Sequence, residues 1–573
     1  MILSNSFRSL FLPLAVSVLL SAAEPVTGPL VVSDRWPECT DLVTWTRDVM
    51  RLEGLEKASE TAQGKAFFRW LRLFNRMATG GMIQAHEGEY GKERYILDSH
   101  KHLFIYGWGY CDTTSRIAEA AWVEFKKDRG AAERVCVQHP EGGFHTMYRL
   151  RLDGGHGAFD PRYGYYVVER DAADARVLDW DGVGVDGNIL RNKTYRHRSA
   201  PFFEFPRIEW QRALDLRPAY YESQEAWEKA GSPAENVFGN AMYKMGTRFH
   251  DMDFRFPRGT TIERFWDNSA RKFYVPAGKS AQREEPFLPS GRFYRVTETM
   301  FDGNWVKHDP NYQKCKPYVV TVPRDEGYNQ DVSGGRTIGQ AWGRITYKPD
   351  LRDGIPTDAL APGTTFVHAT AAPFLRSASQ GGGEAVFDVY SPYVLVDGVL
   401  SGELSGAAND GLKVEIRALR SKPQNSGEPD VWSTWDTLYA GPGEFSVPLG
   451  KERHNGRQVS IHGVYRFQIR ISAQPNAGRR SPAGLNSLKL GLYFENAIMS
   501  IPQIFAGRNT IRFKVRNSSE LRGPVTVAYR YQTATGERSH ERTLRASDFH
   551  DNVASYVIEA PGLERCNSLT IQH

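Results

Sequence analysis

The spacing of apolar residues divides the chain into a helical N-terminal part and a longer β-rich remainder. Between about residues 41 and 78, apolar side chains recur at the spacing of amphipathic helices that face a core. A third helix is predicted from Cys111, because apolar residues again repeat at helical spacing until Gly130 ends the run. From about Val167 onward, the pattern changes to the two-residue alternation that is typical of strands.

Two strand-like runs follow the third predicted helix. Residues 146–152 alternate apolar and polar side chains, glycines at 154–155 predict a turn, and residues 158–168 resume the alternation. A hairpin at this turn brings His145, at the start of the first strand, close to Asp160 on the second. The helix can pack against the hairpin with its first residue, a cysteine, facing the histidine. The pattern therefore predicts a cluster of cysteine, histidine and aspartate.

The remainder of the chain predicts β-structure in several parts. Residues 195–350 contain short strand-like pieces with many aromatic and basic side chains. The Pro-, Gly- and Asp-rich residues 351–365 have the composition of a domain boundary. Beyond them, Gly/Asn/Asp turns separate alternating runs at intervals that predict a β-sandwich. A second, smaller sandwich is predicted after Phe494.

The order and context of three residues resemble the transglutaminase-like superfamily of papain-type thiol enzymes. In that family a cysteine begins a helix after a Gly-rich approach, a histidine opens a strand, and an aspartate, often before proline, lies on a second strand. The motifs GYC, GGFHTMY and AFDP place Cys111, His145 and Asp160 in these positions. The resemblance is strong over a small part of the chain and looser over residues 40–195. One departure is His156, which stands where family members often carry an aromatic residue, and which is a second candidate histidine.

The resemblance implies an α+β fold with a transglutaminase-like (papain-type) core and a β-rich extension, followed by two β-sandwich domains. The second sandwich is expected to be of the fibronectin or immunoglobulin type. The expected parts are a signal peptide (1–23), the transglutaminase-like domain (24–195), its β-rich extension (196–360), the first sandwich (361–495) and the second sandwich (496–573).

The expected chemistry gives each member of the cluster a separate role. Cys111 at a helix N-terminus is favoured as a thiolate, which is the nucleophilic form. His145 can exchange protons with it and with a leaving amine, and Asp160 can orient the histidine. Backbone amides and the Trp108 indole can stabilise an oxyanion. The plainer interpretation is that Cys111 is a small buried apolar residue and His145 an ordinary strand histidine. The candidate substrate-binding residues are Trp108, Tyr110, His156, Tyr163, Arg258 and Arg264.

The cysteine content bears on which thiol is free. An odd number of cysteines outside the cytoplasm predicts at least one unpaired thiol. If Cys111 is that thiol, the other four allow three full pairings, although Cys136 lies in a buried-strand context. The five cysteines are Cys39, Cys111, Cys136, Cys315 and Cys566.

The first 23 residues predict a secretory signal. Arg8 provides a short positive region, residues 10–20 are apolar, and the small residues 21–23 form a cleavage site. The apolar run is too short to cross a bilayer, and no later stretch is long and apolar enough. We therefore expect a secreted or periplasmic protein without a membrane span.

Charge and spacing argue against two classes of partner. The formal net charge of +5 is too small to indicate nucleic-acid binding. The cysteines have no paired spacing of the kind that holds a metal. We expect no metal, no cofactor and no nucleic acid, and the expected partner is an extracellular polymer substrate, either a peptide or a polysaccharide.

Three functions remain open at this stage. The first is a secreted thiol hydrolase or acyltransferase that acts on an amide through Cys111. The second is a polysaccharide-active enzyme, such as a lyase on uronic-acid chains, with His145 or a tyrosine (Tyr163 or Tyr165) as base and arginines neutralising the substrate carboxylate. The third is a non-catalytic protein that binds glycan or peptide. Alkylation of Cys111 with loss of activity distinguishes the first from the others.

Overall fold

The computed structural model describes a large part of the chain, with gaps. The predicted signal peptide lies outside the described residues, as does residue 315. The described residues are 26–79, 98–109, 111–138, 144–160, 165–166, 175–177, 179, 250–267, 270, 295–296, 320–322, 336–338, 340–378, 382–419, 432–450, 459–476 and 482–573.

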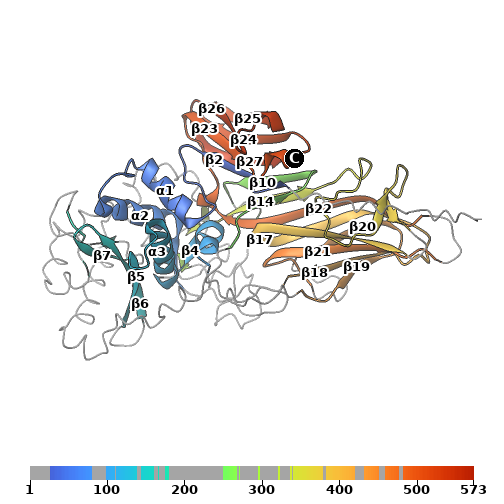
Figure 1. Cartoon of the computed structure of the whole chain (residues 1–573), viewed down its shortest axis with the longest axis horizontal. Coiled ribbons are helices and arrows are strands. Elements are labelled where there is room, and N and C mark those ends of the chain that lie inside the picture. The colour runs from blue at the N-terminus through green and yellow to red at the C-terminus, as the bar shows by residue number, and fades with distance from the viewer. Residues whose placement is uncertain are drawn as a thin grey trace, which may run out of the picture.

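The expected α+β fold with a papain-type core is wrong. Strands make up 48% and helices 17% of the described structure, and most strands belong to one large antiparallel sheet. The helices and a small sheet gather at one end of the molecule, and the large sheet extends away from them (Figure 1). The helical spacing was a correct local signal, but it covers too little of the chain to decide the fold class.

The predicted helices between residues 41 and 78 and from residue 111 are confirmed. Asp41 begins the first helix by accepting a hydrogen bond from the amide of Thr44 (2.8 Å), and Ser59 caps the second through the amide of Ala62 (3.2 Å). None of the helices in the described part of the chain is long and apolar enough to cross a membrane. The helices are α1 (Leu42–Leu52), α2 (Glu60–Phe74), the π-helix η2 (Lys101–Tyr106) and α3 (Cys111–Lys126), with short 3-10 turns at Ile498–Ser500, Ser518–Glu520 and Ala546–Asp548.

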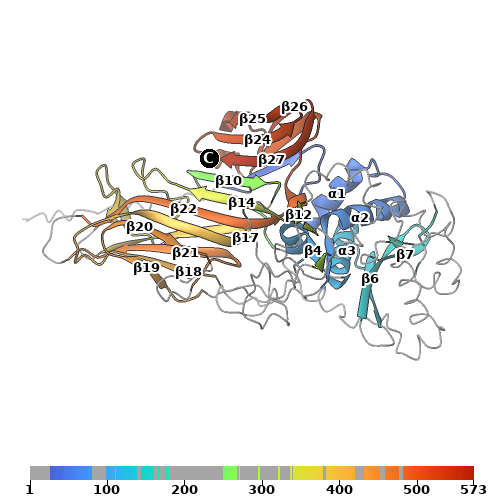
Figure 2. The same ribbon diagram turned by 180° about the vertical axis from the view of Figure 1, so that it is seen from behind.

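The predicted hairpin after the third helix is also confirmed. It turns at Gly154 and Gly155, both of which have a positive φ that favours glycine. It belongs to an antiparallel sheet in the order β5-β6-β7-β8, against which α2 and α3 pack (Figure 2). The strands are β5 (Ala132–Gln138), β6 (Phe144–Leu152), β7 (Gly155–Asp160) and β8 (Tyr165–Tyr166).

One large antiparallel sheet forms most of the molecule. Along its main path the order is β19-β18-β21-β17-β22-β14-β10-β27-β24-β25, with β20 paired to β17 and the pair β15–β16 attached to β22. Its strands are β10 (Thr260–Phe265), β14 (Gln340–Tyr347), β15 (Phe366–His368), β16 (Leu375–Ser377), β17 (Gly383–Ser405), β18 (Lys413–Ala418), β19 (Asp436–Ala440), β20 (Gly443–Pro448), β21 (Val464–Ala473), β22 (Gly484–Ala497), β24 (Val525–Thr533), β25 (Gly536–Leu544) and β27 (Leu563–Gln572).

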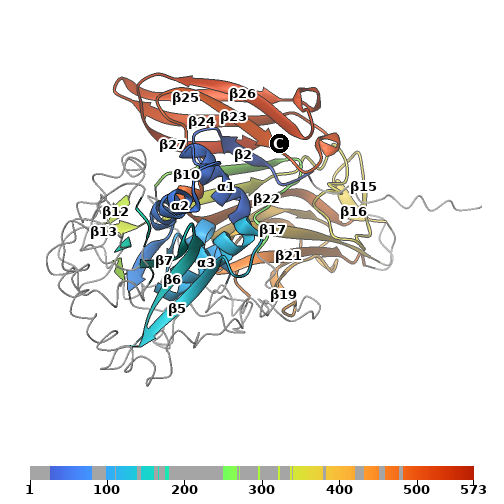
Figure 3. The same cartoon turned by 60° about the vertical axis from the view of Figure 1, so that its left-hand side comes forward.

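The two ends of the described chain share a second layer. β2 (Leu30–Ser33) pairs with β23 (Gly507–Lys514), which pairs in turn with β26 (Val553–Ala560). This sheet lies beside β24, β25 and β27, as Figure 3 shows. The N-terminal strand is therefore an integral part of the C-terminal β-structure. The remaining short pairs are β1 (Val26–Thr27) with β9 (Arg255–Phe256), β3 (Arg76–Thr79) with β4 (Trp108–Gly109) and β11 (Arg295–Val296), and β12 (Val320–Val322) with β13 (Arg336–Ile338).

Sheet pairing crosses the two domain boundaries expected near residues 361 and 496. β10 and β14 precede residue 361, yet β14 pairs with β22 of the first expected sandwich. β10 pairs with β27, which belongs to the second expected sandwich. Backbone hydrogen bonds thus join the expected β-rich extension and the two expected sandwiches into one sheet.

A ladder of alternating arginine and tryptophan side chains lies along β18 and β21. The Arg417 guanidinium lies 4.9 Å from the Trp432 ring and 4.5 Å from the Trp435 ring. Arg470 lies 4.4 Å from the Trp435 ring, and Arg466 lies 5.2 Å from the Trp432 ring. Such stacking places positive charge over the negative ring face and holds the edge strand β19 against its neighbours.

Loss of one ring should measurably destabilise this part of the sheet. We expect Trp435→Ala to lower the free energy of unfolding by about 2 kcal/mol, because two cation–π contacts and the ring packing disappear. Chemical denaturation followed by circular dichroism measures the change. Val399→Ala, at an exposed position of β17 in the same sheet, is the control and should change the free energy little. Equal effects of the two substitutions would contradict a stabilising role for the ladder.

Candidate functional site

The start of α3 and the start of β6 lie at the same end of the helix–sheet unit. The Ser115 hydroxyl, one turn into α3, donates a hydrogen bond to the Thr146 carbonyl (3.2 Å). At the other end, Asp128, just after the helix, pairs with Arg151 near the end of β6. Helix and strand therefore run in the same direction, and the backbone of Cys111 begins the helix beside the start of β6.

The sheet register brings two of the predicted site residues to this end and removes a third. Val137 pairs with His145, and Tyr148 pairs with Phe159, so the next position places the backbone of Asp160 two residues from His145 along β6. His156 pairs with Arg151 at the opposite end of the hairpin. Arg151 and His145 are six positions apart along the strand, which corresponds to about 20 Å.

The structure therefore gathers the backbones of Cys111, His145 and Asp160 at one end of the unit and holds His156 away from them. The side chains of the first three lie outside the described part of the structure, and so the triad stays a prediction. His156 is described and is half-buried near the hairpin turn. This separation favours His145 over His156 as the partner of the cysteine.

A buried polar network holds the chain that leads into Cys111. The Asn75 side chain, after the end of α2, donates to the His102 carbonyl in the π-helix (3.2 Å) and accepts from the Thr114 hydroxyl in the first turn of α3 (2.7 Å). The π-helix ends at Gly107, whose φ of 66° is left-handed. π-helical turns are rare and occur frequently at functional sites. One asparagine thus connects both segments that flank the candidate nucleophile.

The π-helix is also attached to the large sheet. Tyr106 and Tyr465 on β21 share a hydrogen bond between their hydroxyls (3.0 Å), and the Lys101 ammonium lies 4.2 Å from the Tyr465 ring. His250 lies in the same junction, where its Nε2 donates to the carbonyl of Pro392 (2.8 Å). Burial and, to a lesser degree, the nearby Lys101 ammonium lower the pKa of His250 to about 3. The junction therefore contains a histidine that stays neutral at ordinary pH.

The other predicted substrate-binding residues are dispersed. Trp108 pairs with Arg76 through the backbone of β4, and its side chain lies outside the described residues, as do Tyr110 and Tyr163. Arg258 is exposed and forms a salt bridge with Asp353 (2.7 Å). Arg264 is buried, and the structure does not bring it together with Arg258 in one exposed cleft.

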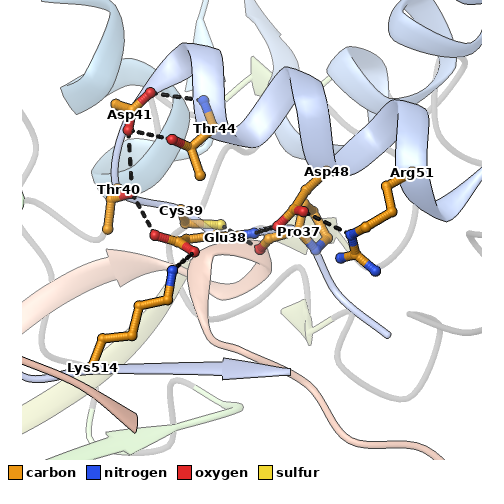
Figure 4. A network of polar contacts seen from close by, with 9 residues as sticks. All are labelled: Pro37, Glu38, Cys39, Thr40, Asp41, Thr44, Asp48, Arg51 and Lys514. Atoms are coloured by element: carbon orange, nitrogen blue, oxygen red, sulfur yellow. Dashed lines mark hydrogen bonds and ion pairs between the residues drawn. The ribbon is translucent and has the colours of Figure 1, made fainter. Parts of the chain in front are cut away.

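Two of the cysteines considered for pairing are buried thiols. Cys39 and Cys566 are both buried and form no disulfide, so a full pairing of the four cysteines other than Cys111 is wrong. Cys39 lies in a polar segment before α1, where its Sγ donates to the Pro37 carbonyl (3.4 Å; Figure 4). Burial raises the pKa of the Cys39 thiol well above its usual value, which makes it a poor nucleophile.

Sequence reasoning missed the residues that support the site. Asn75 follows an apolar helix as an ordinary-looking polar residue, and its two partners are distant in sequence. The ion pair between Arg134 on β5 and Glu119 on α3 (2.6 Å) is buried, and it ties the helix to the sheet. In the sequence, Glu119 follows Arg116 by three residues, a spacing typical of a solvent-exposed charged face of a helix. The sequence therefore did not indicate that Glu119 is buried. The burial of His250 could not be predicted either, because Pro392 and Lys101, which surround it, are far from it in the sequence.

Acid should destabilise the junction through His250. The unfolded state takes up a proton near pH 6.5, whereas the native histidine resists protonation until about pH 3. The stability contributed by the neutral ring is therefore complete above pH 6.5 and is lost as pH falls. We expect His250→Gln to remove roughly 2 kcal/mol of the decrease in unfolding free energy between pH 6.5 and 4.5.

Urea denaturation at a series of pH values measures this difference. His550→Gln is the matched control, because the His550 side chain is 96% exposed. The control should keep the pH dependence of the unmodified protein. If His250→Gln and the unmodified protein lose stability in parallel, the histidine is not the group that responds.

Comparison with known proteins does not assign a family. No protein-family model and no curated protein matches the chain. Two crystal structures of a glycosyl hydrolase family 2 member from Bacteroides cellulosilyticus resemble parts of it, one of them from strain DSM 14838 and the other from microfluidic crystals. Each is 11% identical with a TM-score of 0.13, and they cover 42% and 43% of this chain. The matched region spans only 28% of those enzymes, and a TM-score this low supports no conclusion about fold or function.

Proposed function

We propose that the protein is an exported thiol enzyme that cleaves or transfers an acyl group from an amide, with Cys111 as nucleophile. The observation that carries the proposal is the alignment of α3 with β6. The hydrogen bond between Ser115 and the Thr146 carbonyl fixes the first turn of the helix beside the start of the strand that carries His145. Asp160 ends the next strand of the same sheet.

The position of Cys111 suits a thiolate. It is the first residue of a helix of 16 residues, where unpaired amides and the helix dipole favour negative charge. Asn75 anchors the same turn through Thr114, which limits movement of the helix start. Preorganisation of this kind lowers the cost of bringing the nucleophile to its substrate.

The proposed reaction has two steps. The Cys111 thiolate attacks the amide carbonyl carbon and forms a C–S bond, and backbone amides at the helix start stabilise the oxyanion. Collapse breaks the C–N bond while the His145 imidazolium gives its proton to the departing amine. Water, deprotonated by His145, then attacks the thioester, which releases the acid and regenerates the thiol. An acceptor amine in place of water makes the same enzyme a transferase.

The proposed substrate is an extracellular polymer, either a peptide or a glycan that carries an amide. The sequence-based expectation of export supports a substrate outside the cytoplasm. We propose hydrolysis as the main reaction and transfer as its variant.

The thiol mechanism can be tested by substitution and by labelling. We expect Cys111→Ala to lower kcat by at least about 1000-fold on a responsive substrate from a panel of peptides and acidic glycans, because covalent catalysis is lost. Iodoacetamide applied to the folded protein should label Cys111 and inactivate it. Cys39 and Cys566 are internal controls for labelling, since both are buried.

The histidines provide a matched pair. His145→Ala should be nearly as damaging as Cys111→Ala, Asp160→Asn less so, and His156→Ala mild, because His156 lies at the far end of the hairpin. Full activity of Cys111→Ala together with inactivity of His145→Ala would exclude the thiol mechanism. A rise in ultraviolet absorbance on a uronic-acid polymer would then favour the lyase alternative.

A further inference from the structure

Arg264 occupies an inward-facing position of β10. Along this strand Thr260, Ile262 and Arg264 are buried, whereas the residues between them are partly exposed. The Arg264 side chain is only 6% exposed, although it carries a permanent charge. Buried and partly exposed positions alternate along β10, and a buried position, where an apolar residue is usual, is occupied by a cation.

The contacts of Arg264 are with neutral groups. Its Nη2 donates to the Ser500 hydroxyl (2.9 Å), and its guanidinium lies 4.7 Å from the Tyr393 ring. Its Nε is buried and has no hydrogen-bond partner among the described residues. No carboxylate in the described parts of the chain forms an ion pair with it.

The titratable groups near Arg264 do not supply the missing negative charge. Burial raises the pKa of the Cys39 thiol and of the Tyr393 and Tyr529 hydroxyls, which keeps all three protonated. The Cys39 thiol and the Tyr529 hydroxyl also donate their protons to backbone carbonyls, those of Pro37 (3.4 Å) and Pro502 (3.0 Å).

The two carboxylates that line the adjoining cavity are neutralised elsewhere. Glu38 points toward Lys514 and forms a salt bridge with it (2.7 Å), as Figure 4 shows. Asp253 forms a salt bridge with Arg516. Each carboxylate therefore has its own cation, which leaves the charge of Arg264 uncompensated by the described residues.

Arg134 is another buried arginine of this chain, and it has a carboxylate partner. Arg134 is 2% exposed and forms an ion pair with Glu119 at 2.6 Å. Removing an ion from water without a partner costs several kcal/mol, so a buried unpaired guanidinium needs a counter-ion. The contrast points to a ligand beside Arg264 that the protein does not itself provide.

A small cavity lies where such a ligand would bind. It is bordered by β2, the segment before α1, β10 and β27, and Arg264, Tyr393, Ser500 and Cys39 contribute to its wall. Its volume is about 30 Å³, above the roughly 10–15 Å³ that a cavity needs to hold one water, so it has room for a single-atom ion. We propose that this cavity is a binding site for a monoatomic anion, namely chloride, held by the Arg264 guanidinium.

The site would act as a structural counter-ion. It lies where the N-terminal segment, the large sheet and the C-terminal strands meet, because β10 pairs with both β14 and β27. An anion that binds only the native state stabilises it by mass action, with a saturable dependence on concentration. This inference does not depend on the proposed thiol chemistry.

Halide titration of the intact protein tests the proposal. Protein exchanged into sodium gluconate is titrated with sodium chloride at constant ionic strength, and the melting temperature is followed by differential scanning fluorimetry. We expect a saturable rise of several degrees with chloride and with bromide, in contrast to the non-saturating rise that sulfate gives by exclusion from the protein surface. Arg264→Met should lose this response, whereas Arg258→Met, at an exposed arginine of the same region, should keep it.

A direct observation covers the case in which Arg264→Met does not fold. Crystals of the unmodified protein soaked in sodium bromide should show an anomalous peak beside the Arg264 guanidinium. A melting temperature that does not change with halide would overturn the proposal. So would bromide confined to the protein surface, or a response retained by Arg264→Met.

Discussion

Backbone pairing on both edges of β10 is the interaction on which the rest of the structure depends. On one edge Ile262 pairs with Ile345 of β14, and on the other it pairs with Ile571 of β27. Through β14 the strand reaches β22 and the long β17, and through β27 it reaches β24 and β25. Each pair satisfies backbone amides and carbonyls that would be costly to bury alone. Without this strand, the C-terminal strands and the rest of the large sheet would be separate.

The same constraint explains where charge can be tolerated. The inward face of β10 lies in a crowded interior, so the guanidinium of Arg264 has little access to water. On the outward face, Glu263 pairs with Arg344 of β14 in a partly exposed salt bridge. An exposed pair of this kind costs little and contributes little. A charge on the inward face is far more costly, because it is removed from water. For this reason the proposed anion site lies at the junction that β10 forms with β14 and β27.

The helix–sheet unit depends on its contacts with the large sheet. Tyr465 contacts both Lys101 and Tyr106, and the Pro392 carbonyl accepts a hydrogen bond from His250 Nε2. These contacts hold the π-helix, which Asn75 connects to the first turn of α3. The position of the candidate nucleophile is thus tied to β17 and β21, residues that follow it by several hundred positions.

The sequence by itself determined the local elements, because helical and strand periodicity and turn-forming glycines act over a few residues. Those signals predicted the three helices, the hairpin at Gly154 and Gly155, and the order of Cys111, His145 and Asp160. The predicted α+β fold with a papain-type core was wrong, because the resemblance covers a small part of the chain and does not indicate how much sheet the rest forms. The entry of β2 into the C-terminal layer, the burial of Arg264 and the neutral His250 each depend on partners more than 100 residues away. Only tertiary structure decided these features, because burial and register arise from long-range packing that no local pattern encodes.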